Sequence, residues 1–260
     1  MDQVVDRVIA LYMDNQRAYD DNPPSPGTTV GEEDGPGDAG RGYEDVNLAI
    51  SFIDHALQAA QQAVQAQVDE ETVVAALLHD IGWLAPKPKD ATKLTSADEK
   101  IFLAKHDQVG ASMLRQLGFT ERLARLVEGH VQAKRYLTFK EADYYENLSA
   151  GSKFTLKHQG GPMSASEASA FEAEDDFPLY CLMRRWDEAA KIPDMKLPAF
   201  DSYRAAIRRC LSAGLWQPRR GYDVNDLLTE SDLQSFQNQG AATALEPHLP
   251  ISTARPSLNL

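Results

Sequence analysis

Apolar residues recur with helical spacing through most of this chain. In the stretch 46–67, for example, Leu48, Phe52, His55 and Ala59 fall on one stripe at positions i, i+4, i+7 and i+11. Other stretches with helical patterns are 3–19, 70–82, 107–117, 120–135, 165–174, 179–191 and 200–213. Stretches that alternate apolar and polar residues with the period of two typical of strands are almost absent. The pattern therefore predicts an all-α protein.

The two ends of the chain differ from this helical middle. The segment 21–41 is rich in proline, glycine and acidic residues and has almost nothing to bury, which predicts a long linker. Residues after 228 show no sustained periodicity and predict a loose tail. We therefore expect an N-terminal helix and linker (1–42), a helical domain (43–216) and a partly disordered C-terminal extension (217–260).

Composition and charge exclude several classes of partner. The chain has 260 residues and a formal net charge of −13, which argues against binding to nucleic acid or to anionic membranes. No stretch approaches the roughly 18 consecutive apolar residues of a membrane span, and the first thirty residues lack a secretory signal. Cys181 and Cys210 lie in apolar helical stretches and are expected to be buried thiols. We expect a cytoplasmic protein. The sequence does not predict its oligomeric state.

Four of the six histidines lie inside predicted helices, each beside apolar neighbours: His55, His79, His106 and His130. A single histidine on an apolar face is usually a core side chain. Imidazoles that converge from several helices are instead what a transition metal needs. His79 is followed by Asp80, and adjacent residues project about 100° apart around a helix. Such a pair can serve two metal ions through a bridging carboxylate, and Asp187 adds a second carboxylate on a late helix.

The order H…HD…H…H…D resembles the ligand set of the HD-domain superfamily, whose six-ligand form holds two metal ions. The surrounding sequence resembles one branch of it, the mixed-valent diiron oxygenases, which includes the C–P-cleaving 2-amino-1-hydroxyethylphosphonate dioxygenase. Myo-inositol oxygenase is more distantly similar. The resemblance covers about residues 43–210. Its segments are FIDHALQAA at 52–60, KHDQVGASMLRQLGF at 105–119, LVEGHVQAKRYL at 126–137, FTLKHQGGPM at 154–163 and RRWDEAAK at 184–191.

This resemblance implies an HD-domain helical bundle around a dinuclear site of two iron ions, Fe(II) and Fe(III), with O2 as co-substrate. The implied iron ligands are His55, His79, Asp80, His106, His130 and Asp187. The resemblance further implies that Lys134 and Arg184 bind a phosphonate group, a small anionic substrate. The other implied substrate-pocket residues are Ser152, Thr155 and Gln159. Without the resemblance, Lys134 and Arg184 would be interpreted as ordinary surface charge.

Two positions depart from the pattern of this branch. Its Tyr-x-x-Glu motif falls on Asp45 and Leu48 here, and Trp83 stands where the branch often has histidine. The glutamate is expected to bind the substrate ammonium group, and a buried ammonium without a partner is costly. The Trp83 ring can instead hold a quaternary ammonium by cation–π attraction, or wall off a smaller pocket. We therefore expect an N-methylated or amine-free substrate to be preferred over the primary amine.

The resemblance predicts a dioxygenase of phosphonate catabolism that uses O2 to cleave a small α-hydroxyphosphonate to a carboxylate and phosphate. One alternative is a metal-dependent HD phosphohydrolase acting on a small phosphate ester or nucleotide, which would use the same ligands to make a hydroxide. Another is a non-catalytic HD binding module, although a scaffold does not need six metal-binding side chains. An assay without oxygen separates the first two.

Overall fold

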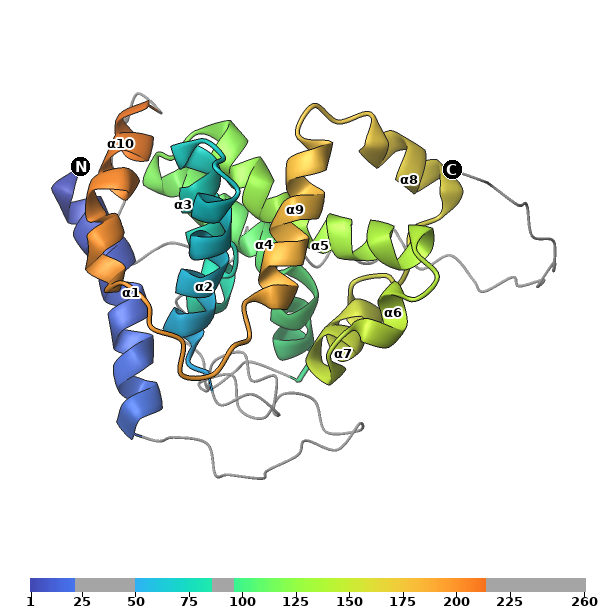
Figure 1. Cartoon of the computed structure of the whole chain (residues 1–260), viewed down its shortest axis with the longest axis horizontal. Helices are drawn as coiled ribbons and strands as arrows, with labels where there is room; N and C mark the ends of the chain where they lie inside the picture. The colour runs from blue at the N-terminus through green and yellow to red at the C-terminus, as the bar shows by residue number, and fades with distance from the viewer. Residues whose placement is uncertain (22–49, 86–95, 214–260) are drawn as a thin grey trace.

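A computed structural model describes residues 1–21, 50–85 and 96–213, with residues 96–104, 212 and 213 described by their backbone alone (Figure 1). This part of the chain is helical and contains no strand, which confirms the all-α prediction. The predicted linker beyond Asp21 and the predicted tail lie outside the described residues. Asp45 and Leu48 lie outside them as well.

The described helices, including two short 3-10 turns (η1 and η3), follow one another along the chain. They are α1 (Asp2–Asp21), α2 (Phe52–Gln65), α3 (Glu70–Leu78), η1 (Ile81–Leu84), α4 (Ser96–Leu117), α5 (Glu121–Lys140), α6 (Tyr144–Asn147), α7 (Ala150–His158), α8 (Ala165–Glu172), α9 (Phe177–Ala189), η3 (Phe200–Tyr203) and α10 (Arg204–Ala213). The sequence pattern did not predict α6 and α7, which are short and carry few apolar residues. The other helices overlap the predicted stretches, but their first and last residues differ from the predicted ones.

Local hydrogen bonds explain where two of these bounds fall. The helix predicted from residue 46 begins at Phe52, because the Ser51 hydroxyl accepts a hydrogen bond from the Asp54 amide at 3.1 Å and so caps the helix. The helix predicted over 70–82 ends at Leu78. Asp80 then has φ −101° and ψ 9°, and η1 follows. The direction of the Asp80 side chain is therefore set by a turn, not by helical spacing.

Helices α2, α3, α4, α5 and α9 pack on one another and form the centre of the bundle. In Figure 1, α2, α3 and α9 stand side by side in front of α4 and α5, while α6 and α7 lie together near one end of α5. Long apolar side chains fill the space between these helices, and Leu77, Leu78, Ile81, Leu123 and Val127 are completely buried. The centre of the protein thus consists of two layers of helices whose facing sides meet in one hydrophobic core.

Helix α1 packs on α2 and α10 at one edge of this bundle (Figure 1). Val5, Val8 and Tyr12 are buried along its inner face. The Tyr12 ring stacks on Phe200 with 4.4 Å between ring centroids, and its hydroxyl donates a hydrogen bond to the Leu77 carbonyl oxygen at 3.1 Å. The N-terminal helix therefore shares the hydrophobic core of the bundle.

Glycine permits a close approach between η1 and α4. A Cβ atom on Gly82 would lie 1.9 Å from the carbonyl oxygen of His106 and 2.8 Å from the backbone nitrogen of Gly110. No side chain fits there. Just before His106, Lys105 interrupts α4 with non-helical torsion angles of φ −136° and ψ 22°. The missing side chain of Gly82 thus lets the turn that follows Asp80 rest directly on the backbone of His106.

The described residues also bear on two general expectations. None of the described helices is both long and apolar enough to cross a membrane. Cys181 and Cys210 are free thiols, as expected. Cys210 is buried, but Cys181 is only partly buried, so the prediction of two buried thiols is wrong for Cys181. It lies on a face of α9 that the bundle leaves half covered.

Candidate metal centre

The six predicted metal ligands come from five segments that meet inside the bundle. His55 lies in the first turn of α2, His130 in the middle of α5 and Asp187 near the end of α9. The other three flank irregular backbone: His79 and Asp80 follow the last residue of α3, and His106 follows the kink in α4. Each of the six side chains is at most 4% exposed. Polar groups buried to this extent need partners.

Asp80 lies between two pairs of histidines. His55 and His79 approach one another with 3.2 Å between their Nε2 atoms, and His106 and His130 with 3.0 Å. The Oδ2 atom of Asp80 faces the first pair, at 3.5 Å from His55 and 3.3 Å from His79. Its Oδ1 atom faces the second pair, at 3.4 Å from His106 and 3.6 Å from His130. Each carboxylate oxygen is therefore shared with one pair, the arrangement of a bridging ligand.

Asp187 completes the first half of this centre. Its Oδ1 atom lies 3.3 Å from His55 Nε2 and 3.9 Å from His79 Nε2. The other oxygen, Oδ2, accepts a hydrogen bond from Arg184. The Oδ1 atom thus faces the histidines, while the Oδ2 atom is held by Arg184 from outside the cluster. Two groups of potential ligand atoms result, and they share the bridging aspartate: His55, His79 and Asp80, and Asp80, His106 and His130.

Backbone carbonyl groups fix the direction of three imidazole rings. The Nδ1 atoms of His55, His79 and His130 lie 2.9, 2.9 and 2.6 Å from the carbonyl oxygens of Ala190, Ala76 and Val127. With its Nδ1 proton donated to a carbonyl, a neutral ring presents the Nε2 lone pair to the cluster. Lone pairs about 3 Å apart repel one another unless a cation lies between them. The donor set and its orientation thus fit a pair of metal ions.

The charges of the cluster point in the same direction. Burial lowers the pKa of His106 to about 4 and of His130 to about 3, so both rings are neutral at pH 7. Burial would also lower the pKa of His55, but hydrogen bonds to Asp187 and Asp80 outweigh it and raise that pKa to about 9. Burial would raise the pKa values of both carboxyl groups, but His79 and His55 hold that of Asp80 well below the usual range, and Arg184 and His55 do the same for Asp187. Two ionised carboxylates therefore lie among four buried imidazoles, and the proton that His55 holds supplies positive charge that a metal cation would otherwise supply.

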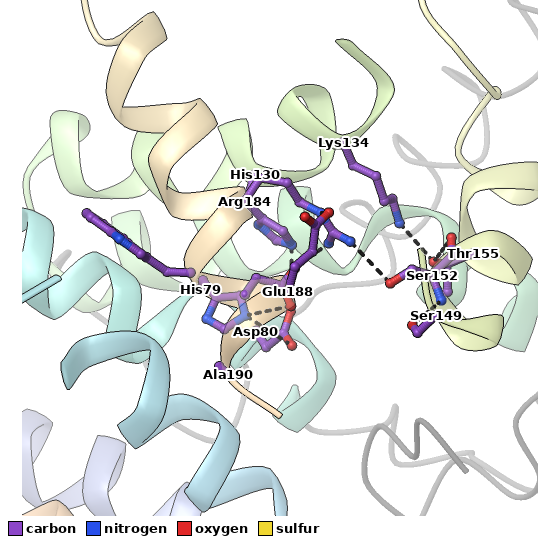
Figure 2. Close-up of polar contacts among 12 residues, drawn as sticks. His79, Asp80, His130, Lys134, Ser149, Ser152, Thr155, Arg184, Glu188 and Ala190 are labelled. Carbon is purple, nitrogen blue, oxygen red and sulfur yellow. Dashed lines mark hydrogen bonds and ion pairs between the residues drawn. The ribbon is translucent and has the colours of Figure 1, made fainter. Parts of the chain in front are cut away.

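Next to the metal centre lies a pair of buried cations, Lys134 and Arg184, 1% and 2% exposed. The interpretation as surface charge is therefore wrong for both. Lys134 Nζ donates to the Thr155 hydroxyl at 2.8 Å, and Arg184 Nη2 donates to the Ser152 hydroxyl at 3.1 Å (Figure 2). Both hydroxyl groups belong to α7, so this short helix holds the two cations on one side of the centre. Burial, with a contribution from Arg184, lowers the pKa of Lys134 to about 7.

The remaining two predicted substrate residues are Trp83 and Gln159. Trp83, in η1, stacks on the imidazole of His106 with 4.6 Å between ring centroids and 19° between planes. The structure thus places it directly against a predicted ligand. Gln159 directly follows the last residue of α7, and its backbone amide donates to the Thr155 carbonyl oxygen at 3.0 Å. Of the predicted pocket residues, the described contacts bring Lys134, Thr155, Ser152 and Arg184 together.

Sequence reasoning missed three buried or partly buried polar residues beside the centre. Tyr144 and Glu188 both contact the Arg184 guanidinium. Glu188 stands four residues after Arg184, a helical spacing that could have indicated an ion pair. Asp107 follows His106 and is 1% exposed. Neither oxygen of its carboxylate accepts a hydrogen bond from the described residues, and burial raises its pKa to about 7. No sequence signal marks Asp107 as buried.

With this geometry established, the chain can be compared with known proteins. The family model described as "HD domain" matches residues 52–155. A hydroxymethylphosphonate dioxygenase of Gimesia maris is 34% identical over 177 residues, which cover 67% of this chain and 83% of that protein. The [1-hydroxy-2-(trimethylamino)ethyl]phosphonate dioxygenase (glycine-betaine-forming) of Leisingera caerulea is 34% identical over 160 residues, 62% of this chain and 79% of the relative.

An uncharacterized protein, L432, of Acanthamoeba polyphaga mimivirus is also similar, at 31% identity over 171 residues, 66% of this chain and 76% of the relative. The HD match ends at Thr155 and includes five of the six predicted ligands. Asp187 lies beyond it. The carboxylate of Asp187, on α9, thus lies outside the segment that the HD-domain model matches.

Proposed function

This chain belongs to the HD-domain phosphonate-cleaving oxygenases, and from that premise we propose that it uses two iron ions and O2 to cleave the C–P bond of a small α-hydroxyphosphonate. The products would be a carboxylate and phosphate. For hydroxymethylphosphonate the balance is one O2 consumed, one formate and one phosphate formed. The observation that carries the proposal is the Asp80 carboxylate, whose two oxygens each face one histidine pair.

The residues that would hold the two metal ions are those of the cluster: His55, His79 and Asp187 for one, His106 and His130 for the other, with Asp80 between them. Imidazole and carboxylate ligands suit iron, and we propose a mixed-valent Fe(II)/Fe(III) pair. Such a pair supplies electrons to O2 and orients the substrate oxygen atoms. The runner-up, a phosphohydrolase, would use the same ligands without O2.

The protein's own contribution is to bind and orient the anion. Arg184 places a buried positive charge on one side of the cluster, and a bound dianion would favour the protonated form of Lys134, whose pKa of about 7 leaves it partly charged at neutral pH. Helix α7 holds both side chains through Thr155 and Ser152. A phosphonate dianion that bound there would exchange its water shell for charge-assisted hydrogen bonds in a site already desolvated. It would also offset the cost of burying the two cations together. Since Arg184 already pairs with Asp187 and Glu188, the bound anion would chiefly supply the counter-charge for Lys134.

Trp83 is the described residue that bears on which phosphonate is accepted. Its ring packs on His106, and it offers an aromatic face where a histidine would offer a hydrogen bond. An aromatic face attracts a quaternary ammonium by about 0.5–2 kcal/mol and needs no counter-charge. We therefore expect an amine-free or N-methylated substrate to be favoured over 2-amino-1-hydroxyethylphosphonate. The relatives named above are consistent with this expectation, since their names specify a hydroxymethyl and a trimethylamino substrate.

The proposed function is tested on iron-loaded protein by measuring O2 uptake and phosphate release together, in air and under argon. We expect equal amounts of O2 consumed and phosphate released in air, and no phosphate under argon. Phosphate release from a phosphate ester that continues under argon would establish the hydrolase instead. A comparison of kcat/KM for hydroxymethylphosphonate and the trimethylated and primary amines then tests the role of Trp83. A preference for the primary amine would contradict it.

A further inference from the structure

The Arg184 guanidinium is held from three directions. Its Nη1 atom donates to Asp187 Oδ2 and its Nη2 atom to the Ser152 hydroxyl at 3.1 Å. On the opposite side, Nε donates to Glu188 Oε1 at 2.9 Å and approaches the Tyr144 hydroxyl at 3.2 Å. The first two partners belong to the candidate metal centre and the anion pocket. The last two belong to neither.

Glu188 and Tyr144 are also bonded to each other. The Tyr144 hydroxyl donates to the same Oε1 atom that accepts from Arg184. Tyr144 begins the short helix α6 and is 6% exposed, so it reaches the arginine from a segment forty residues away along the chain. A glutamate that served only to pair with an arginine on its own helix would not need this third member. In Figure 2 Glu188 lies next to Arg184.

A guanidinium group is planar, so fixing its Nε–H direction fixes the directions of both terminal nitrogens. We propose that Glu188 and Tyr144 are a positioning pair for Arg184: they lock the guanidinium plane at Nε so that Nη1 stays on Asp187 and Nη2 stays beside Ser152, toward the phosphonate. This inference rests on the proposed function, because it takes the phosphonate as the ligand on the Ser152 side. The pair touches neither metal nor substrate.

Two simpler roles for Glu188 predict different results. As an ordinary i,i+4 partner it would stabilise α9 and leave binding unchanged. As a balancing negative charge it would weaken the attraction of Arg184 for an anion, so that its removal would tighten binding. Positioning predicts the opposite effect. It further predicts that an uncharged acceptor of the same shape restores much of the function, since the geometry at Nε is what matters.

The test uses Glu188→Ala, Glu188→Gln and Tyr144→Phe, with Glu141→Gln as a matched control. Glu141 pairs with Arg185, the next residue of α9, on the surface. Each protein is loaded with iron and titrated with methylphosphonate under argon by calorimetry, and iron content, melting temperature, KM and kcat are measured beside it. We expect Glu188→Ala to weaken methylphosphonate binding and raise KM about 10-fold or more at unchanged iron content.

Glu188→Gln should recover most of that loss, Tyr144→Phe should give a smaller loss, and Glu141→Gln should behave as the unsubstituted protein. Unchanged methylphosphonate affinity in Glu188→Ala would overturn the inference, as would equal losses in Glu188→Ala and Glu188→Gln. If the unsubstituted protein binds methylphosphonate but shows no O2-dependent turnover, the proposed function fails while the binding series still decides on the positioning pair. If it binds no methylphosphonate at all, the positioning pair is refuted as well.

Discussion

Gly82→Ala should disrupt the contact between η1 and α4. The new Cβ atom would lie 1.9 Å from the carbonyl oxygen of His106 and 2.8 Å from the nitrogen of Gly110. Both are backbone atoms, so no side-chain rotation can relieve the contact, and the two segments must separate by roughly 1 Å or more. Overpacking that a core can partly absorb costs about 1–3 kcal/mol. We therefore expect a loss in the free energy of unfolding of about 3 kcal/mol or more.

The same displacement should damage the candidate metal centre. Asp80 precedes η1, and its Oδ1 atom lies 3.4 Å from His106 Nε2 on α4. Pushing η1 away from α4 widens this distance directly. Misplacement of a reacting group by about 1 Å can lower a rate by about 100-fold. Iron content should fall together with activity, since Asp80 is proposed to bridge both ions.

Gly110→Ala is a matched control on the other side of the contact. Its Cβ atom would meet the nitrogen of Gly82 at 3.1 Å and the Ile81 side chain at 3.3 Å, which is tight but not prohibitive. Replacing a helical glycine by alanine also gains up to about 1 kcal/mol, so we expect a small net effect. The assay is thermal unfolding with elemental analysis for iron. For a chain of this size about 3 kcal/mol corresponds to a drop of roughly 6–12 °C. A Gly82→Ala protein with full iron and a melting temperature within about 2 °C of the original would refute the reasoning.

Three further predictions concern the metal centre, the anion pocket and a surface ion pair. Asp80→Ala should lower iron content more than Asp187→Ala, since a bridging ligand serves both ions; equal iron contents would contradict the bridge. Lys134→Ala should raise KM roughly 10- to 100-fold while iron content stays normal, because a charge-assisted hydrogen bond contributes about 1.5–3 kcal/mol; an unchanged KM would leave Lys134 a structural role only. Partial burial would raise the pKa of Asp69, but its hydrogen bonds from Arg122 outweigh that and lower it to about 2. The stabilisation that ionised Asp69 gives the folded protein should thus be present above about pH 4 and be lost as the pH falls toward 2. The deficit in melting temperature of Asp69→Asn should therefore shrink from about pH 5 to about pH 3. A deficit that is constant with pH would exclude the ion pair as its cause.

Much of the fold could be predicted from the sequence because its helices are amphipathic and clearly capped. Asp69 and Thr120, for instance, cap their helices by accepting hydrogen bonds from the backbone amides of Thr72 and Leu123. The convergence of the histidines could be anticipated for the same reason, since each stands on an apolar face and apolar faces meet in the core. What failed was local geometry that depends on distant contacts. Helix α3 ends before Asp80, and η1 begins just after it and lies close against α4. The periodicity of apolar residues in the sequence carries no information about that close approach.

The surroundings of Arg184 show a second limit. Its spacing to Asp187 and Glu188 is visible in the sequence as i+3 and i+4, and both contacts are present. The contact with Tyr144 is not visible, because it comes from α6, a helix of one turn with too few apolar residues to show a period. The burial of Lys134 was likewise inaccessible to pattern reasoning, which assigns a lysine to the surface by default. The resemblance to a known family identified it where physical patterns did not.

The packing of Tyr12 on the far side of α3 has a practical consequence for dissecting this protein into fragments. Its hydroxyl donates to the carbonyl oxygen of Leu77, two residues before His79, so the end of α3 next to the HD pair is anchored from a segment that precedes the HD match by about forty residues. A recombinant fragment cut to residues 52–155 would lose that anchor and Asp187 together. Reassembly from separately expressed pieces should therefore succeed only when α1 and α9 are both supplied. The minimal autonomous unit is thus larger than the segment that the HD-domain model matches.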